Sequence, residues 1–171
     1  MAVKGLQKVL KNLHKFGAEA AVEIDKTTFA ISEAIAREAK TNVIKNLDNL
    51  GKSIHTVALG ESDYKVVVGA SYGAYVEFGT GIKVQVPTEM QEIASQFKNK
   101  KSGSFETGLR SIKDWCKNKG IDESAAYPIF ISILNKGIQP KPYLYPAFVK
   151  GRKQYKKDLK DLLKILTKKY E

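Results

Sequence analysis

Cysteine is nearly absent from this sequence, since Cys116 is the only one among 171 residues. No disulfide can therefore form within the chain, cysteine-rich zinc sites are excluded, and a reducing compartment is expected. Histidine is also scarce, and neither His14 nor His55 has a second histidine or a cysteine at ligand spacing. We therefore expect no metal and no other cofactor.

Long apolar runs are missing as well. No stretch approaches the roughly 20 apolar residues of a membrane span. Lysines interrupt the apolar residues of the N-terminal segment MAVKGLQKVLKNL, so the continuous apolar core of a signal peptide is not found there. We expect a protein with no membrane partner that is made and used inside a cell.

Acidic residues are outnumbered, with 18 Asp and Glu against 29 Lys and Arg, which gives a formal net charge of +11. Such a surplus indicates a polyanion nearby, either nucleic acid or an acidic protein surface, and a general solubility charge is the alternative. Neither a phosphate-binding glycine loop nor a groove-reading motif is present. Contact with DNA would therefore run through phosphates, without sequence preference.

The remaining pattern predicts an α+β fold in one domain over residues 1–171. Residues 1–50 are read as N-terminal helices, with a helix over 3–16, a stop or kink at Gly17, and a long helix over 18–47. The apolar stripe of the long helix is narrow and rich in small residues. It could pack on a sheet of its own subunit or against a neighbouring copy.

The middle of the chain begins with residues 51–87, where Ile54–Leu59 and Tyr64–Gly69 flank a turn signal and predict a β-hairpin. Alternation over 82–86 suggests one more strand of a small antiparallel sheet. Residues 88–136 read as a helical insertion, in which Trp115 and Cys116 share an apolar stripe. Its third helix begins near Asp122 or Tyr127, so that Pro128 either starts it or bends it.

Residues 137–171 combine a proline-rich segment with a C-terminal helix. Pro146 suits the first turn of this helix, which is expected to run to about Lys169. Its predicted apolar stripe comprises Tyr155, Leu159, Leu162, Leu163, Leu166 and Tyr170.

The segment YGAYVEFGT at 72–80 places one acid, Glu77, among aromatic residues. Glu77 could be a general base, but no Asp, Glu or His flanks it as a partner. The structural interpretation is a short helical turn that Gly79 ends with a positive φ. Glu77 would then accept hydrogen bonds from loop amides or pair with a cation of a neighbouring subunit. We favour this interpretation.

Two motifs in order resemble a known family. YGAYVEFGT resembles the Tyr-Ala-x-Tyr-Val-Glu-Phe-Gly-Thr signature of phage neck proteins, and GIQPKPYLYPAF at 137–148 resembles their later proline segment. Gly73 and Tyr143 stand where that family usually has alanine and phenylalanine. The resemblance, over roughly 40–150, is to the HK97 gene-product-ten-like group of head–tail joining or tail-completion proteins, related in role to the minor tail protein Z type.

The resemblance implies a non-enzymatic virion protein at the head–tail junction that resides in the host cytoplasm during assembly. It implies a ring of copies, often six, between a head-completion or adaptor protein and a tail terminator or tail tube protein, with packaged DNA nearby. The alternative is a non-specific nucleic-acid-binding protein. The expected assembly residues are Tyr72, Tyr75, Glu77, Phe78, Gly79, Thr80, Pro140, Pro142, Tyr143, Leu144 and Pro146. The candidate DNA-facing residues are Lys150, Arg152, Lys153, Lys156 and Lys157, for which a solvated helix face is the alternative.

Overall fold

The computed structural model describes residues 4–44, 47–70, 72–79, 86–98, 105–137 and 139–170. The chain forms two compact units, one from Met1–Ala70 with Tyr143–Glu171 and the other from Ser71–Pro142. The expectation of a single domain over 1–171 stays a prediction. The strand expected over 82–86 falls, apart from Val86, outside the described residues.

The elements confirm the α+β class. The first unit contains α1 (Lys4–Asn42), α2 (Asp48–Ser53), β1 (Ile54–Gly60), β2 (Asp63–Val68) and α7 (Leu144–Tyr170). The second contains α3 (Gly73–Phe78), the 3₁₀ turn η1 (Thr88–Met90), α4 (Gln91–Lys98), α5 (Phe105–Asn118), the 3₁₀ turn η2 (Glu123–Ala125) and α6 (Ala126–Lys136). The helical insertion is thus confirmed, and α2 was not expected.

Helix α1 runs through Gly17, so the predicted stop at this residue is wrong. A glycine in a helix interior costs only about 1 kcal/mol relative to alanine, which the flanking turns can offset. The same helix ends at Asn42 rather than at residue 47.

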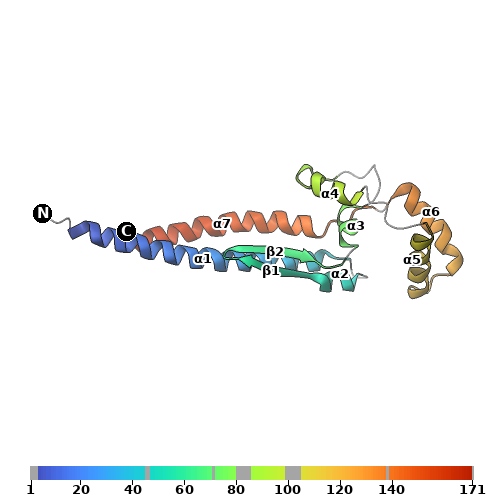
Figure 1. Cartoon of the computed structure of the whole chain (residues 1–171), viewed down its shortest axis with the longest axis horizontal. Helices are drawn as coiled ribbons and strands as arrows, with labels where there is room; N and C mark the ends of the chain where they lie inside the picture. Colours follow the sequence, from blue (N-terminus) through green and yellow to red (C-terminus); the bar gives the residue numbers. More distant parts are fainter. Residues whose placement is uncertain are drawn as a thin grey trace. The chain divides into compact units, whose positions relative to one another are not determined.

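Helices α1 and α7 lie side by side and antiparallel (Figure 1). Near the start of α7, the Asn42 side-chain amide donates a hydrogen bond to the carbonyl of Tyr143 over 3.0 Å. In the middle, the hydroxyls of Thr28 and Tyr155 lie 2.9 Å apart. At its end, the Tyr170 ring meets that of Phe16, with a centroid distance of 5.8 Å. The apolar stripe of α1 therefore packs on α7.

Small residues let the two helices approach closely. Ala39 and Ala147 are buried, and an ideal Cβ built on Gly151 would lie 2.3 Å from Cγ1 of Ile35. Most of the predicted α7 stripe is buried or half-buried, but Leu163 is 50% exposed, so its assignment to the stripe is wrong. In this turn of α7, Leu166 is the buried residue of the stripe, and Leu163 lies next to it on the helix surface.

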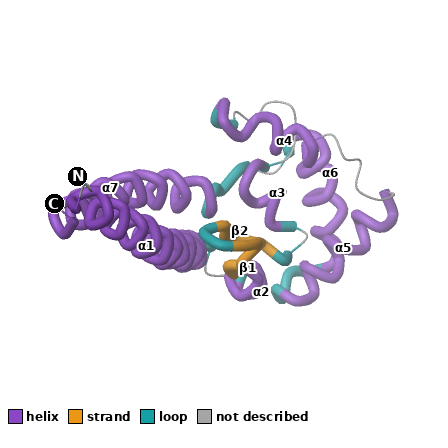
Figure 2. The backbone as a smooth tube through the Cα atoms, turned by 60° about the vertical axis from the view of Figure 1, so that its left-hand side comes forward, coloured by secondary structure: helices purple, strands orange, loops and turns teal. Residues whose placement is uncertain are grey.

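The hairpin packs on α1 (Figure 2). Strands β1 and β2 pair antiparallel, with Ile54 opposite Val68 and Ala58 opposite Tyr64. A single carboxylate oxygen of Asp25 accepts from the Ser62 amide over 2.8 Å and from the Tyr64 hydroxyl over 2.9 Å. The long helix thus contacts both the sheet and α7, and the predicted contact with the sheet is confirmed.

In the second unit, α5 and α6 pack around Phe130. Its ring lies so close to Gly108 that a Cβ added to this glycine would be 2.7 Å from Cε2 of Phe130. Cys116 is fully buried, as predicted, whereas Trp115 is 44% exposed and lies off the stripe expected for it. Consecutive residues of an α-helix point in directions about 100° apart around its axis, which separates the two side chains. Pro128 lies in the first turn of α6, where its missing N–H costs no helical hydrogen bond.

Candidate assembly and polyanion-facing surfaces

The first motif forms the short helix α3, as predicted. Glu77 and Phe78 in its last turn are 5% and 7% exposed, while Tyr72 before it is partly exposed. Gly79 ends the helix with φ 68° and ψ −176°, a backbone conformation that is essentially restricted to glycine. The predicted positive φ is thereby confirmed. Thr80 lies outside the described residues.

A hydrogen bond joins the first motif to the proline segment, because the Lys141 amide donates to the carbonyl of Val76 over 2.8 Å. Pro140 and Pro142 have no N–H to donate, so Lys141 carries the only backbone donor of this tripeptide. Two segments more than 60 positions apart in the chain are thus in contact within one unit.

The rest of the proline segment belongs to the other unit. Tyr143 is 2% exposed, and its carbonyl accepts the Asn42 hydrogen bond described above. Leu144 begins α7 and Pro146 lies in its first turn, as predicted. The expected assembly residues are therefore divided between the units, with Tyr143 as the first residue on the α1–α7 side.

Glu77 is buried, and it is not a free charge. A buried carboxylate needs hydrogen bonds or a cation to offset the cost of leaving water. Its burial at the end of a glycine-terminated helix fits the interpretation as a pairing group. Its role in assembly stays a prediction.

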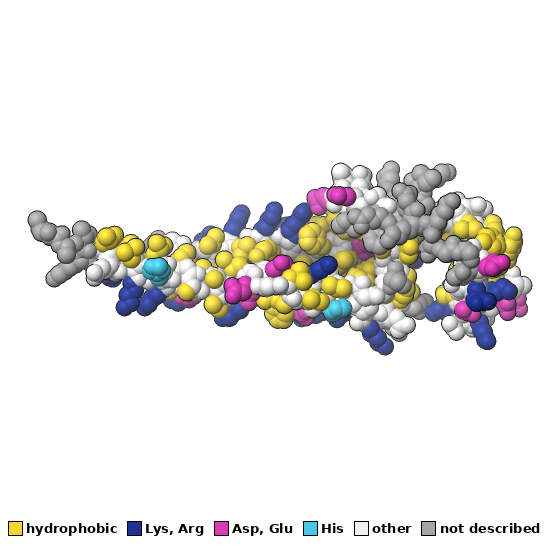
Figure 3. All heavy atoms as spheres, viewed as in Figure 1, with side chains coloured by type: hydrophobic (Ala, Val, Ile, Leu, Met, Phe, Trp, Pro, Cys, Tyr) yellow, Lys and Arg dark blue, Asp and Glu magenta, His cyan; other side chains and the backbone are white. Residues whose placement is uncertain are grey.

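The five candidate DNA-facing residues all lie exposed on α7. Lys150 pairs with Glu38 over 2.9 Å, and the Arg152 guanidinium lies 5.7 Å from the centroid of the Phe148 ring. Lys153, Lys156 and Lys157 fall on the side of the helix away from Gly151, and so away from α1. Figure 3 shows a row of dark-blue side chains along the outer edge of α7. This face could contact a polyanion or water.

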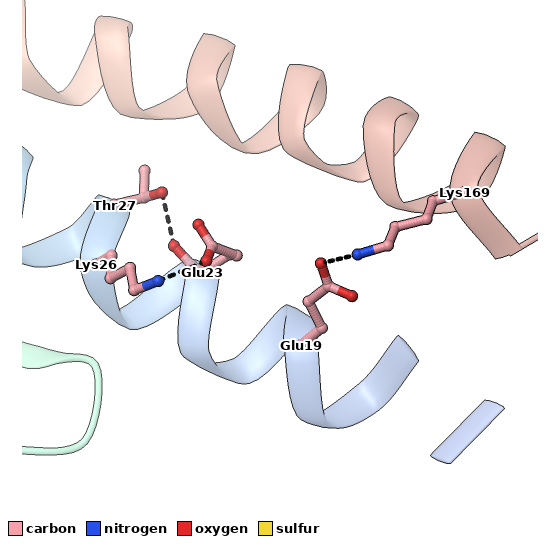
Figure 4. Close-up of polar contacts among 5 residues, drawn as sticks. All are labelled: Glu19, Glu23, Lys26, Thr27 and Lys169. Carbon is pink, nitrogen blue, oxygen red and sulfur yellow. Dashed lines mark hydrogen bonds and ion pairs between the residues drawn. The ribbon is translucent and has the colours of Figure 1, made fainter. Parts of the chain in front are cut away.

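Glu19 on α1 holds the far end of α7 (Figure 4). Its two carboxylate oxygens accept hydrogen bonds from the Lys169 ammonium and, over 2.6 Å, from the Tyr170 hydroxyl. The hydrogen bond from Lys169 first, and that from Tyr170 second, lower the pKa of Glu19 below its ordinary value. The hydrogen bond to Glu19 raises the pKa of Tyr170 above its ordinary value.

This contact predicts that the last turn of α7 loosens in acid. Because the native pKa of Glu19 is depressed, its stabilising contribution is complete above the ordinary carboxyl pKa of 4.5 and is lost as the pH falls through the lower native value. Hydrogen exchange at residues 166–170, corrected for intrinsic rates, should show protection that decreases as the pH falls below 4.5. In Glu19→Gln the protection should be weaker at neutral pH and insensitive to acid. An equally acid-sensitive Gln variant would contradict this assignment.

Several residues that shape these surfaces were missed in the sequence. Asp25, Asn42 and Glu19 each act across a large sequence separation, so no local pattern marks them. Gly151 had a signal, because a glycine inside a long lysine-rich helix lowers helix propensity without forming a turn. Such a glycine indicates close approach of another element.

Within the described residues, no three or more His, Cys, Asp or Glu side chains come together to hold a metal ion. Nor does any helix among them have the length and apolar character to cross a membrane.

The geometry thus defines a class, an α+β protein built on an antiparallel helix pair with a docked hairpin, in which a glycine-terminated helix contacts a proline segment. Residues 7–79 match the family described as "Bacteriophage HK97-gp10, putative tail-component". Over this segment the chain is similar to the HK97-gp10-like family, and the resemblance is confirmed there. The match spans most of α1, the hairpin and the first motif through Gly79; for the second motif the resemblance stays a prediction. No curated protein and no solved structure matches the chain.

Proposed function

We propose that this protein is a structural component of the neck of a tailed phage, where a ring of copies joins the DNA-filled head to the tail. The family match over residues 7–79 carries the proposal, because it includes α3 with Glu77. The contact between Lys141 and Val76 supports it, since it brings the two motifs of the resemblance together. No catalytic chemistry is needed for such a role.

The proposed partners follow from this position. Copies of the chain contact one another head to tail around a closed ring, proposed to have six members, in which each contact is heterologous. One face of the ring meets a head-completion or adaptor protein, and the other meets a tail terminator or tail tube protein. The α7 lysines are proposed to face packaged DNA, and their exposed row also supports the alternative, a free non-specific nucleic-acid-binding protein.

Cryo-electron microscopy of the virion tests the proposed position directly. We expect density for this chain between the portal and the tail tube, and its absence from the head–tail junction would refute the neck assignment. The alternative predicts tight DNA binding by the isolated protein with a steep salt dependence.

Glu77→Gln tests the role of the buried carboxylate. Glutamine keeps the volume of glutamate but removes the charge, and charge-assisted hydrogen bonds are about twice as strong as neutral ones. We expect soluble, folded protein whose ability to restore infectivity in a complementation assay falls by about tenfold or more. Glu92→Gln, an exposed acid in the same unit, should complement normally. If Glu77→Gln assembled normally and lost a catalytic turnover instead, Glu77 would be a catalytic group.

A further inference from the structure

An exposed aromatic side chain lies at the start of the cationic face of α7. Phe148 is 43% exposed, whereas Ala147 beside it is buried against α1. The Arg152 guanidinium lies over the Phe148 ring, 5.7 Å from its centroid. A single exposed apolar residue is common on protein surfaces and needs no partner. The neighbours of Phe148 therefore decide whether its ring has a role.

Phe148 begins a ridge of side chains whose other members are cations. The ridge continues at steps of four with Arg152, Lys156 and Lys160, and residues at this spacing form one continuous row along a helix. All four side chains are exposed. Each step advances about 6 Å along the helix axis. We call this row the Phe148 ridge, and it presents cations at regular intervals next to one aromatic ring.

Phosphates account for the cations of the ridge but not for its ring. The bases of a single strand stack on aromatic rings and on guanidinium planes, and Phe148 with Arg152 offers both kinds of flat surface. A duplex presents phosphates and base edges, whereas the faces of its bases are stacked on one another. Only a strand with unpaired bases can therefore use the whole ridge.

We propose that the Phe148 ridge binds single-stranded DNA, with a base stacked on Phe148 and Arg152 and phosphates on Lys156 and Lys160. An acidic protein surface could satisfy the same cations, but it would leave the ring without a stacking partner. The inference rests on the proposed function in that both place DNA beside α7. It adds that a strand with unpaired bases, rather than a duplex, is the preferred ligand.

Two oligonucleotides of equal charge separate stacking from attraction to phosphates. One is a 20-nucleotide oligothymidylate and the other an abasic strand of the same length, and fluorescence anisotropy at 0.1 M salt gives the Kd of the full chain for each. We expect the oligothymidylate to bind about tenfold or more tightly, since stacking of one base on an aromatic ring changes affinity by roughly 5- to 100-fold. Equal affinities would overturn the inference.

Phe148→Leu tests the ring itself. Leucine keeps an apolar side chain and favours the helix, but it offers no flat surface. We expect the affinity for the oligothymidylate to fall by about tenfold, and the affinities for the abasic strand and for a 20-base-pair duplex to stay unchanged. Phe29→Leu makes the same change at a phenylalanine of α1 that is 48% exposed and should alter none of the three. Circular dichroism checks that both variants keep their helix content. If Phe148→Leu weakened all three ligands alike, the ring would act through the fold and the inference would be wrong.

A ribo-oligothymidylate of the same length tests the sugar of the strand. Stacking and phosphate contacts are available to RNA as well, so binding of the ribo-strand about tenfold more tightly than the deoxy-strand would assign the ridge to RNA and contradict the proposal. Failure to bind any of these strands would leave the α7 cations to an acidic protein or to solvent, which also contradicts it. A neck ring whose protein binds the abasic strand as well as the oligothymidylate would refute the inference alone. Stacking-dependent binding by a chain absent from the head–tail junction would refute only the proposed function.

Discussion

Gly151→Ala is expected to lower the free energy of unfolding by roughly 2 kcal/mol, the middle of the range for overpacking a close contact. The new Cβ would lie 2.3 Å from Cγ1 and 2.6 Å from Cδ1 of Ile35, which is itself buried on α1. The clash outweighs the better helix propensity of alanine, which is worth about 1 kcal/mol. Urea denaturation followed by circular dichroism measures the change.

Two variants control for this interpretation. Gly17→Ala changes another helical glycine of the same helix pair, where nothing lies within 4 Å of an added Cβ, and it should stabilise by about 0.5–1 kcal/mol. Gly151→Ala combined with Ile35→Ala should be less destabilised than the sum of the two single changes by about 1 kcal/mol. A Gly151→Ala protein as stable as the wild type would show that α1 and α7 do not approach as closely as described.

Reversing the charge of Lys153, Lys156 and Lys157 to Glu should reduce the affinity for double-stranded DNA by roughly a hundredfold or more at 0.1 M salt. All three side chains are exposed on the side of α7 away from α1, so the fold should survive. If each contacts one phosphate, the slope of log K against log salt concentration should fall in magnitude by about 3. A fluorescence-anisotropy titration at several salt concentrations measures both quantities.

The matched control reverses Lys8, Lys11 and Lys15 on α1, which removes the same amount of positive charge from the other terminal helix. A smaller loss for this control would locate the DNA contact on α7. Equal losses would mean that net charge alone attracts DNA. Unchanged infectivity of the α7 variant would favour the alternative in which these lysines form a solvated helix face.

Much of the local structure could be predicted from short-range patterns. The hairpin follows from two β-branched runs around a turn, and α3 follows from an apolar segment closed by Gly79, whose φ of 68° few other residues adopt. The position of Pro146 in the first turn of α7 follows from its missing N–H. Gly17 shows the limit of this reasoning, because a helix-breaking tendency of about 1 kcal/mol is small beside the packing of a long helix.

The candidate assembly site also has features that the sequence predicts and features that it does not. The residue types of both motifs were evident in the sequence, and so was the choice of Glu77 as the residue to explain. The contact between the two motifs could not be predicted from the sequence. The hydrogen bond from Lys141 to Val76 joins backbone groups, and every residue except proline offers the same donor. Asn42 and Asp25 were missed for a related reason, since short polar side chains gain their role from whichever distant group arrives beside them.

The sequence by itself determined the α+β class, the hairpin, the helical insertion, the cationic face of α7 and the likeness to the phage family. These depend on residue type and spacing within a few turns or strands, where steric preference and apolar periodicity act directly. Only the tertiary structure decided that the α1 stripe packs on α7, that Ile35 packs against Gly151, and that the last residue of α7, Tyr170, lies beside Phe16 of α1. An apolar stripe favours burial against any apolar surface of fitting shape, because the hydrophobic effect has no direction. Its partner is therefore settled by the packing of the whole unit.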